Sequence, residues 1–108
     1  ARLYFQKLKK NKKIILPINK KLSSGAWLEF PIIIKNKKKI YENLLNNNID
    51  CRFFSYPNCS KLKIFKKYSS ECKNAEFVSK NILMLPTYYG YPIKQAKKII
   101  NIINSSDI

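Results

Sequence analysis

The chain has 108 residues and a mass of 12.7 kDa, which is the size of one domain and leaves no room for two independent cores. Hydrophobic residues make up 45% of it and aromatic residues 13%, so the sequence can bury a core and is not compositionally disordered. It carries 22 Lys and Arg against 6 Asp and Glu, a formal net charge of +16. Taken alone, that charge indicates a nucleic acid or an anionic membrane as partner.

Several absences narrow the function. The sequence has no histidine, which excludes Ser-His-Asp and Cys-His catalysis and every His-ligated metal site. Its two glycines, Gly25 and Gly90, are too few for a glycine-rich phosphate loop. The three cysteines (Cys51, Cys59 and Cys72) lack metal-binding spacing and fit reduced thiols in a cytoplasmic setting. The apolar runs are too short to span a bilayer, and we expect no signal peptide and no membrane partner.

The positive charge consists almost entirely of lysine. There are 20 Lys and only two arginines, Arg2 and Arg52; together with 12 Asn and 16 Ile, lysine fills 48 of 108 positions. All three residue types have A/T-rich codons, so their joint excess indicates an A/T-rich genome. A phosphate-binding surface would favour arginine, whose planar fork binds phosphate bidentately. The lysines also lie in small groups along the whole chain, which favours solvated faces over one nucleic-acid patch.

In chain order, the first elements are a helix and two strands. Residues 2–9 have apolar residues at helical spacing, and residues 14–16 predict a short buried strand that a proline ends. A polar loop is expected over residues 18–25. Residues 27–34, aromatic and β-branched, predict the best strand of the chain, and Pro31 indicates that this strand is an edge or carries a bulge.

The middle of the chain predicts a helix, a strand and an irregular connection. Asn36 is a plausible N-cap for a helix over residues 37–47, and residues 49–54 return as a strand. Residues 55–70 form a long connection with one helical turn near 62–65. The apolar face of the helix is expected to hold Ile40, Tyr41, Leu44 and Leu45.

The last third predicts a helix, a strand and a longer helix. The helix around residues 71–80 is expected to bury Ala75, Phe77 and Val78. Residues 82–85 form a short apolar strand, and Pro92 opens the final helix. Its apolar stripe consists of Ile93, Ala96, Ile99, Ile100 and Ile103. The resulting order, α-β-β-α-β-α-β-α, predicts an α+β fold in which helices cover a small mixed or antiparallel sheet.

Four sequence signals in fixed order carry a family resemblance. A helix is followed by "IILP" and "AWLEFPIII"; the next helix runs into "NNNIDCRFFSYPNCS"; another runs into "NILMLPTYYGYP"; an amphipathic helix closes the chain. This order resembles the C-terminal small domain of the DegT/DnrJ/StrS family of pyridoxal-phosphate-dependent sugar aminotransferases. The resemblance spans roughly residues 1–104, and "ILMLPTYYG" is its most specific piece.

The resemblance implies the fold of the C-terminal domain of fold-type-I aminotransferases. Residues 1–108 would be one such small domain, and residues 1–9 the end of the helix that joins it to a large domain absent from this chain. The chain starts with Ala and its only methionine is Met84, so we expect a processed or excised product. The Schiff-base lysine and the phosphate cup would lie in the large domain, so this chain alone is expected to be inactive and to bind no cofactor.

The complete enzyme, by the same resemblance, would use pyridoxal 5'-phosphate and an amino donor to aminate a nucleotide-linked keto-sugar for surface polysaccharide. It would be a cytoplasmic homodimer, and the small domain would close the cofactor cleft. The resemblance implies substrate binding by Arg52, Tyr56, Asn58, Cys59 and Ser60, with no catalytic or metal-binding residue in this chain.

Two positions depart from the family pattern. Cys59 or Ser60 stands where the family commonly has a histidine, which puts the usual substrate contact there in question. Asn48 stands where a glycine is common, and asparagine tolerates the same left-handed conformation.

Alternatives remain open for individual residues. Arg52 either binds a substrate carboxylate or phosphate, or forms an ion pair that anchors the loop to Asp50 or to the missing large domain. The turn from Tyr56 to Ser60 also fits ordinary turn chemistry. Trp27 is expected to pack in the core, and the tyrosines around Gly90 to pack as a surface loop. At the level of function, the alternatives are a stand-alone basic module that binds a polyanion and an inactive split remnant of the aminotransferase.

Overall fold

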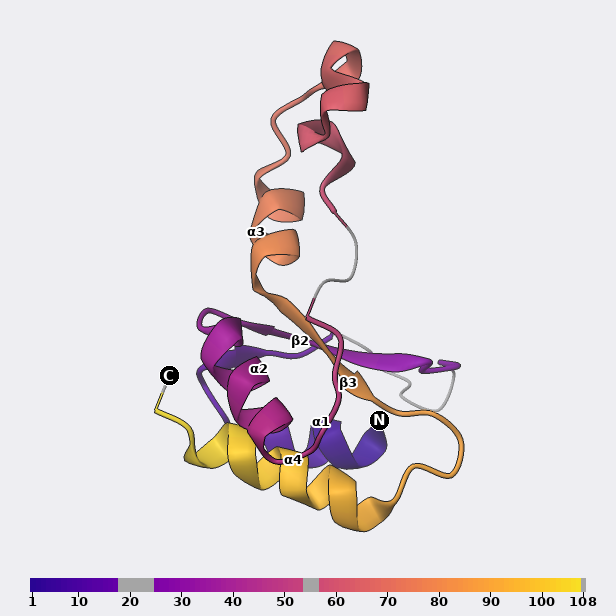
Figure 1. The fold of residues 1–108 in the computed structure, drawn as a ribbon, viewed down its shortest axis with the longest axis vertical. Coiled ribbons are helices and arrows are strands. Elements are labelled where there is room, and N and C mark those ends of the chain that lie inside the picture. The colour runs from indigo at the N-terminus through magenta and orange to yellow at the C-terminus, as the bar shows by residue number, and fades with distance from the viewer. Residues whose placement is uncertain (18–24, 54–56, 108) are drawn as a thin grey trace.

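Within the part of the chain that the structure describes, residues 1–17, 25–53 and 57–107 of a computed structural model, three strands form an antiparallel sheet in the order β1-β2-β3 (Figure 1). The predicted loop at 18–25 lies outside these residues except for Gly25. The strands are β1 (Ile14–Ile15), β2 (Glu29–Ile34) and β3 (Ile82–Pro86).

One face of the sheet is buried under three helices. These helices are α1 (Arg2–Leu8), α2 (Lys37–Asn46) and α4 (Ile93–Ser105). Alternate residues of β2 and β3 point to this face, as the period of two in a strand requires. They are Phe30, Ile32, Ile34, Leu83 and Leu85, all almost fully buried. The predicted α+β fold with a helix-covered sheet is therefore confirmed.

The final helix matches its predicted stripe with one exception. Ala96, Ile99, Ile100 and Ile103 are buried, whereas Ile93 is 63% exposed at the first turn.

At the other end of the chain, the Tyr4 hydroxyl donates to the Pro86 carbonyl over 3.0 Å and ties α1 to the end of β3. Burial raises the pKa of Tyr4 well above its usual value.

Pro31 lies in the central strand, and the register with β3 runs through it without a bulge, so neither the edge nor the bulge that was expected is found. Its cross-strand neighbour Met84 exchanges both backbone hydrogen bonds with Arg52 (3.1 Å each), so the Pro31–Met84 pair is a non-hydrogen-bonded pair. On its other side, β1 pairs only with Ile33 and Ile34 among the described residues. The missing N–H of Pro31 therefore leaves no ladder bond unmade.

The predicted strand at 49–54 is wrong in extent. Among the described residues of this segment, only Arg52 pairs, through a single bridge to Met84. The chain leaves α2 through Asn48 in the left-handed region (φ 58), and the Ile49 N–H donates to the Leu44 carbonyl. Ile49 and Cys51 are buried and their neighbours are not, so the segment has the alternating burial of a strand, but among its described residues only Arg52 makes strand-like hydrogen bonds.

Trp27 packs against the core, as expected. Its ring lies 5.5 Å from that of Phe30, and its backbone has a positive φ of 45. A Cβ on Gly25 would lie 2.6 Å from the indole Nε1, so the ring occupies space that only glycine leaves free.

Residues 57–81, here called the arm, project away from the sheet and its helices (Figure 1). The arm contains η2 (Cys59–Lys61), η3 (Lys63–Tyr68) and α3 (Lys73–Asn81). Its two 3₁₀ helices replace the single helical turn that was predicted. No residue from 57 to 80 is buried.

The predicted burial of α3 is wrong. Ala75 and Phe77 are exposed, and Val78 is only half-buried. The reason is that α3 extends beyond the sheet and its covering helices α1, α2 and α4, here called the body, and does not lie across them (Figure 1). The one buried residue of α3 is Asn81, whose side-chain amide donates to the Phe77 carbonyl over 2.8 Å.

Candidate functional site

A cavity of about 890 Å³ opens beside Arg52, at the edge of the sheet that β3 forms. The segment after α2, the start of β2, the end of β3 and the turn before α4 all contribute to its wall. The lining residues are Leu28, Glu29, Tyr41, Asn48, Ile49, Asp50, Cys51, Arg52, Phe53, Met84, Pro86, Tyr88, Tyr91, Pro92 and Gln95.

Arg52 is held in place at both its backbone and its side chain. Its bridge to Met84 fixes the backbone, and its Nε lies 3.0 Å from Glu29 Oε1. The partner of Arg52 is thus Glu29, not Asp50. Because this ion pair uses Nε, the two terminal nitrogens remain for a second acceptor, and they form the edge that binds carboxylate or phosphate bidentately.

Two pairs of aromatic side chains line this cavity. The rings of Tyr41 and Phe53 lie 4.9 Å apart, and those of Tyr88 and Tyr91 meet edge to face at 5.0 Å. Burial, with a smaller contribution from Tyr88, raises the pKa of Tyr91. Tyr88 and Tyr91 line the cavity, whereas Tyr89 is fully exposed, so the expected packing of this loop holds only in part. Tyr88 and Tyr91 were not among the expected site residues, and the clustering of tyrosines around Gly90 is the sequence feature that could have indicated them.

The wall of the cavity also contains the Cys51 thiol. Burial, followed by the charge of Asp50, raises its pKa to about 11. A thiol with that pKa is protonated at neutral pH and is neither a nucleophile nor a metal ligand. The cavity therefore has the features of a binding site: one oriented cation, two carboxylates and aromatic surfaces.

The other expected site residues lie on the arm or outside the described residues. Tyr56 is outside them. Asn58 Oδ1 accepts hydrogen bonds from the Ser60 N–H (3.2 Å) and hydroxyl (2.8 Å), and Cys59 is exposed. None of these three lines the cavity at Arg52. Asn58 Nδ2 is buried and finds no acceptor among the described residues.

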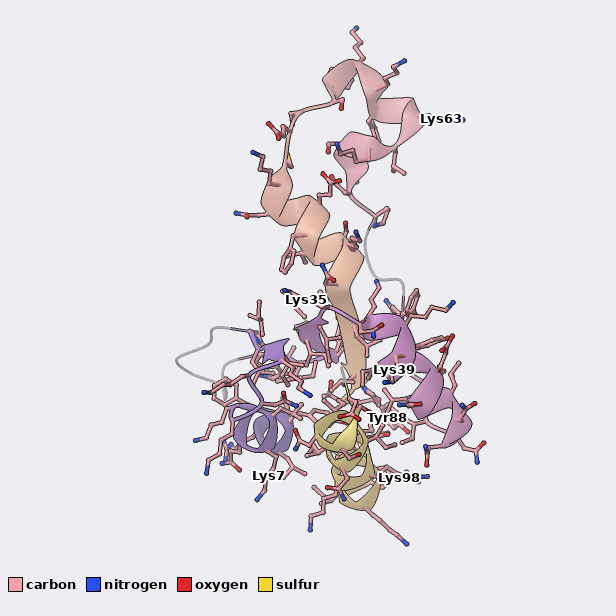
Figure 2. The ribbon with its side chains drawn as sticks, turned by 90° about the vertical axis from the view of Figure 1, so that its left-hand side faces the viewer. Lys7, Lys35, Lys39, Lys63, Tyr88 and Lys98 are labelled. Carbon is pink, nitrogen blue, oxygen red and sulfur yellow. The ribbon has the colours of Figure 1, made fainter. Side chains whose placement is uncertain are left out.

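Lysine side chains point outward from many elements. The labelled Lys7, Lys35, Lys39, Lys63 and Lys98 come from different segments and extend in different directions (Figure 2). This distribution favours solvated faces. No described helix is long and apolar enough to cross a membrane, and no described group of His, Cys, Asp and Glu could hold a metal ion.

Comparison with known proteins places these observations in a family. The sequence profile of the DegT/DnrJ/EryC1/StrS aminotransferase family matches residues 1–104. The chain belongs to this family. No curated protein sequence matches the chain.

Two solved structures of DegT-type aminotransferases share the fold. A DegT DnrJ EryC1 StrS aminotransferase from Brucella abortus superposes with a TM-score of 0.83 at 22% identity over 95% of this chain. DesV from S. venezuelae, solved with a ketimine intermediate, superposes with a TM-score of 0.80 at 18% identity over 94% of this chain. The chain spans 28% of the length of each of these structures.

The DegT family is in general dependent on pyridoxal phosphate, a cofactor that a lysine amine holds as a Schiff base. No lysine lines the cavity at Arg52. Burial lowers the pKa of Lys37, but its Nζ donates to the carbonyls of Phe53 (3.2 Å), Ser79 (3.4 Å) and Ile82 (3.3 Å) and is not presented to a ligand. The cavity at Arg52 in this DegT-family chain therefore presents no lysine amine to a cofactor.

Proposed function

We propose that this chain is the C-terminal small domain of a pyridoxal-phosphate-dependent aminotransferase that acts on a nucleotide-linked keto-sugar. The family match over residues 1–104 carries the proposal. A chain that spans 28% of the related structures corresponds to one part of such an enzyme, and a separate large domain would complete it. In this role the small domain closes the cofactor cleft and lines the substrate pocket.

Arg52 supplies the anion contact in this proposal. Glu29 orients the guanidinium through Nε, and the free edge binds the carboxylate of the amino donor or a phosphate of the nucleotide. The aromatic rings of Tyr41, Phe53 and Tyr88 exclude water and offer stacking surfaces to a sugar or base. Binding and orientation of the substrate are the tasks of these residues, and the cofactor supplies the electron sink.

The turn with Tyr56, Asn58, Cys59 and Ser60 would contribute a second set of contacts. Asn58 Nδ2 is a donor without a described acceptor, and a substrate oxygen would satisfy it. Cys59 or Ser60 would take the place of the family's histidine.

The proposal also covers partners and location. The complete enzyme would be a cytoplasmic homodimer that makes an amino sugar for surface polysaccharide. This chain alone would be inactive, because the Schiff-base lysine and the phosphate cup belong to the large domain.

Reconstitution tests this function. The chain is produced together with the cofactor domain encoded upstream or on a partner chain, and amination of a nucleotide-linked 4-keto-sugar is followed by mass spectrometry. We expect turnover from the pair and none from the chain alone. Absence of turnover from a folded, cofactor-loaded pair would favour the split-remnant alternative and reject the proposal.

The site is tested in the same assay with the two arginines of the chain. Arg52→Met removes the anion contact and should raise KM about tenfold or more, since a charge-assisted hydrogen bond contributes about 1.5–3 kcal/mol. Arg2→Met is the matched control, because Arg2 is exposed on α1 and outside the cavity. Equal KM values for the two variants would remove Arg52 from the substrate site while leaving the enzyme assignment intact.

A further inference from the structure

A second, smaller cavity lies on the outer face of the sheet, where β1 begins and β2 ends. Its volume is about 280 Å³, and its wall combines apolar side chains with three lysines and no acidic residue. The lining residues are Lys12, Lys13, Ile15, Ile33, Ile34, Lys35, Asn36 and Phe77. None of them lines the cavity at Arg52.

The strand register explains why lysines meet here. β1 and β2 pair Ile14 with Ile34 and Ile15 with Ile33, and Lys13 and Lys35 are the turn residues that flank this pairing, before β1 begins and after β2 ends. Both lysines line the cavity together with Ile15 and Ile33. Like charges that lie close together repel each other.

No acidic side chain of the chain relieves this repulsion. All six Asp and Glu residues are described, and none lines the cavity. The ion pairs among described residues involve Lys38, Arg52, Lys61 and Lys73. Lys12, Lys13 and Lys35 therefore surround a hollow that lacks a countercharge within the described residues.

The hollow also has an apolar floor and wall. Ile15 is 55% exposed although it lies in a strand, and Phe77 of α3 is 42% exposed at the edge of the hollow. Phe77, which the sequence pattern places in the core, contributes instead to this cavity. An apolar surface beside uncompensated cations suits a ligand that has an apolar part and an anionic group.

We propose that this cavity binds a small organic anion. Its phosphate or carboxylate would accept hydrogen bonds from Lys12, Lys13 and Lys35, and its apolar part would lie on Ile15, Ile33 and Phe77. The site goes beyond the proposed aminotransferase function and does not depend on it, because the two cavities share no residue.

Titration of the isolated 108-residue chain with phenyl phosphate tests the site, with inorganic phosphate as the probe for charge alone. NMR shifts should saturate at the methyl groups of Ile15 and Ile33 and at the amides of Lys13 and Lys35. Phenyl phosphate should bind about tenfold more tightly than inorganic phosphate, because its phenyl ring would bury apolar surface of the cavity that inorganic phosphate leaves exposed. Shifts spread over all lysines, or equal affinity for the two probes, would overturn the proposal.

A charge-matched pair of double variants separates the cavity from the general basic charge. Lys13→Gln/Lys35→Gln should weaken phenyl phosphate binding about tenfold or more. Lys10→Gln/Lys94→Gln removes the same charge from exposed positions outside the cavity and should change the affinity less than about twofold. Equal weakening by both double variants would show that the attraction is diffuse, and the site would be rejected.

Stability without ligand provides a readout that a merely structural role would not reproduce. If the lysines of the cavity repel each other, Lys13→Gln/Lys35→Gln should raise the urea midpoint of the free protein above that of the unsubstituted chain at low salt. Phenyl phosphate, which should raise the midpoint of the unsubstituted chain, should no longer raise that of the double variant. A lower midpoint would show that the lysines support the fold, contrary to the proposal. If the double variant does not fold, Lys35→Gln alone is measured in its place, and an unchanged affinity for phenyl phosphate in that variant would reject the site.

Discussion

Helices α3 and α4 both carry apolar residues at helical spacing, yet α4 buries four of them and α3 buries none. α4 lies against α1 and α2 under the sheet, so its stripe has partners within the chain. α3 leaves the body at the start of β3 and contacts it mainly near β2 (Figure 1). An amphipathic pattern therefore predicts that a helix face has a partner, but it does not specify which surface that partner is.

The arm is instead held by polar contacts. Lys61 Nζ lies 3.6 Å from Glu76 Oε2, which joins η2 to α3 through two half-exposed side chains. At its base, the Lys37 ammonium reaches carbonyls on both stems of the arm, at Phe53 and at Ser79 and Ile82. Body and arm therefore differ in kind: apolar burial stabilises the first, and exposed ion pairs and hydrogen bonds orient the second.

The largest expected effect comes from truncating each helix at its apolar face. Ile99→Ala removes a fully buried side chain of α4 and should lower the free energy of unfolding by about 2–5 kcal/mol. Phe77→Ala removes a larger but 42% exposed side chain of α3 and should cost less than about 1 kcal/mol. Urea unfolding of the two variants measures the difference. Similar losses would contradict the division into body and arm.

The cysteines offer a second contrast, because Cys51 lies in the body and Cys59 and Cys72 lie on the arm. The folded state holds the pKa of Cys51 at about 11, against 9.0 for a free thiol, so between these values the unfolded chain binds fewer protons. Stability from this group is complete below pH 9 and is lost as the pH rises toward 11, by about 2 kcal/mol at the upper end.

Unfolding midpoints measured across that pH range check the sign. The decline should be shallower for Cys51→Val, which cannot ionise, than for the unsubstituted chain. Cys59→Ala is the control, since its thiol is exposed on the arm, and it should follow the unsubstituted chain. Parallel curves for all three proteins would refute the proposed burial of the Cys51 thiol.

Local signals predicted most of the body. The stripe of α4 apart from Ile93 and the left-handed Asn48 depend on neighbours within a few residues, and both are found as expected. The strand predicted at 14–16 is present as Ile14–Ile15, but only Ile14 is buried and Ile15 is 55% exposed. The arm was not predicted, because its position relative to the sheet depends on tertiary contacts such as those of Lys37 and not on a local sequence pattern.

The candidate site was predicted in part for the same reason. The sequence indicated Arg52, whereas its partner Glu29 and the wall at Tyr88 lie far away in the chain and meet it only through the bridge to Met84. Long-range pairing of this kind is set by tertiary packing, not by spacing.

The smallest of these effects concerns the junction between body and arm. Lys37→Met keeps an apolar side chain of similar length, but removes the donors to three carbonyls and the cation–π contact of Nζ with the Phe53 ring, which is 4.5 Å away. We expect a local loss of about 1 kcal/mol, less than for a fully buried charged donor because Lys37 is only half-buried. That loss corresponds to roughly fivefold faster hydrogen exchange of amides in α3, with α4 unchanged.

Lys38→Met is the control, since the Lys38 ion pair with Glu42 is exposed on the same helix and should contribute little. If both variants leave exchange in α3 unchanged, the arm is held by contacts other than Lys37; if both accelerate α4 as well, body and arm unfold as one unit.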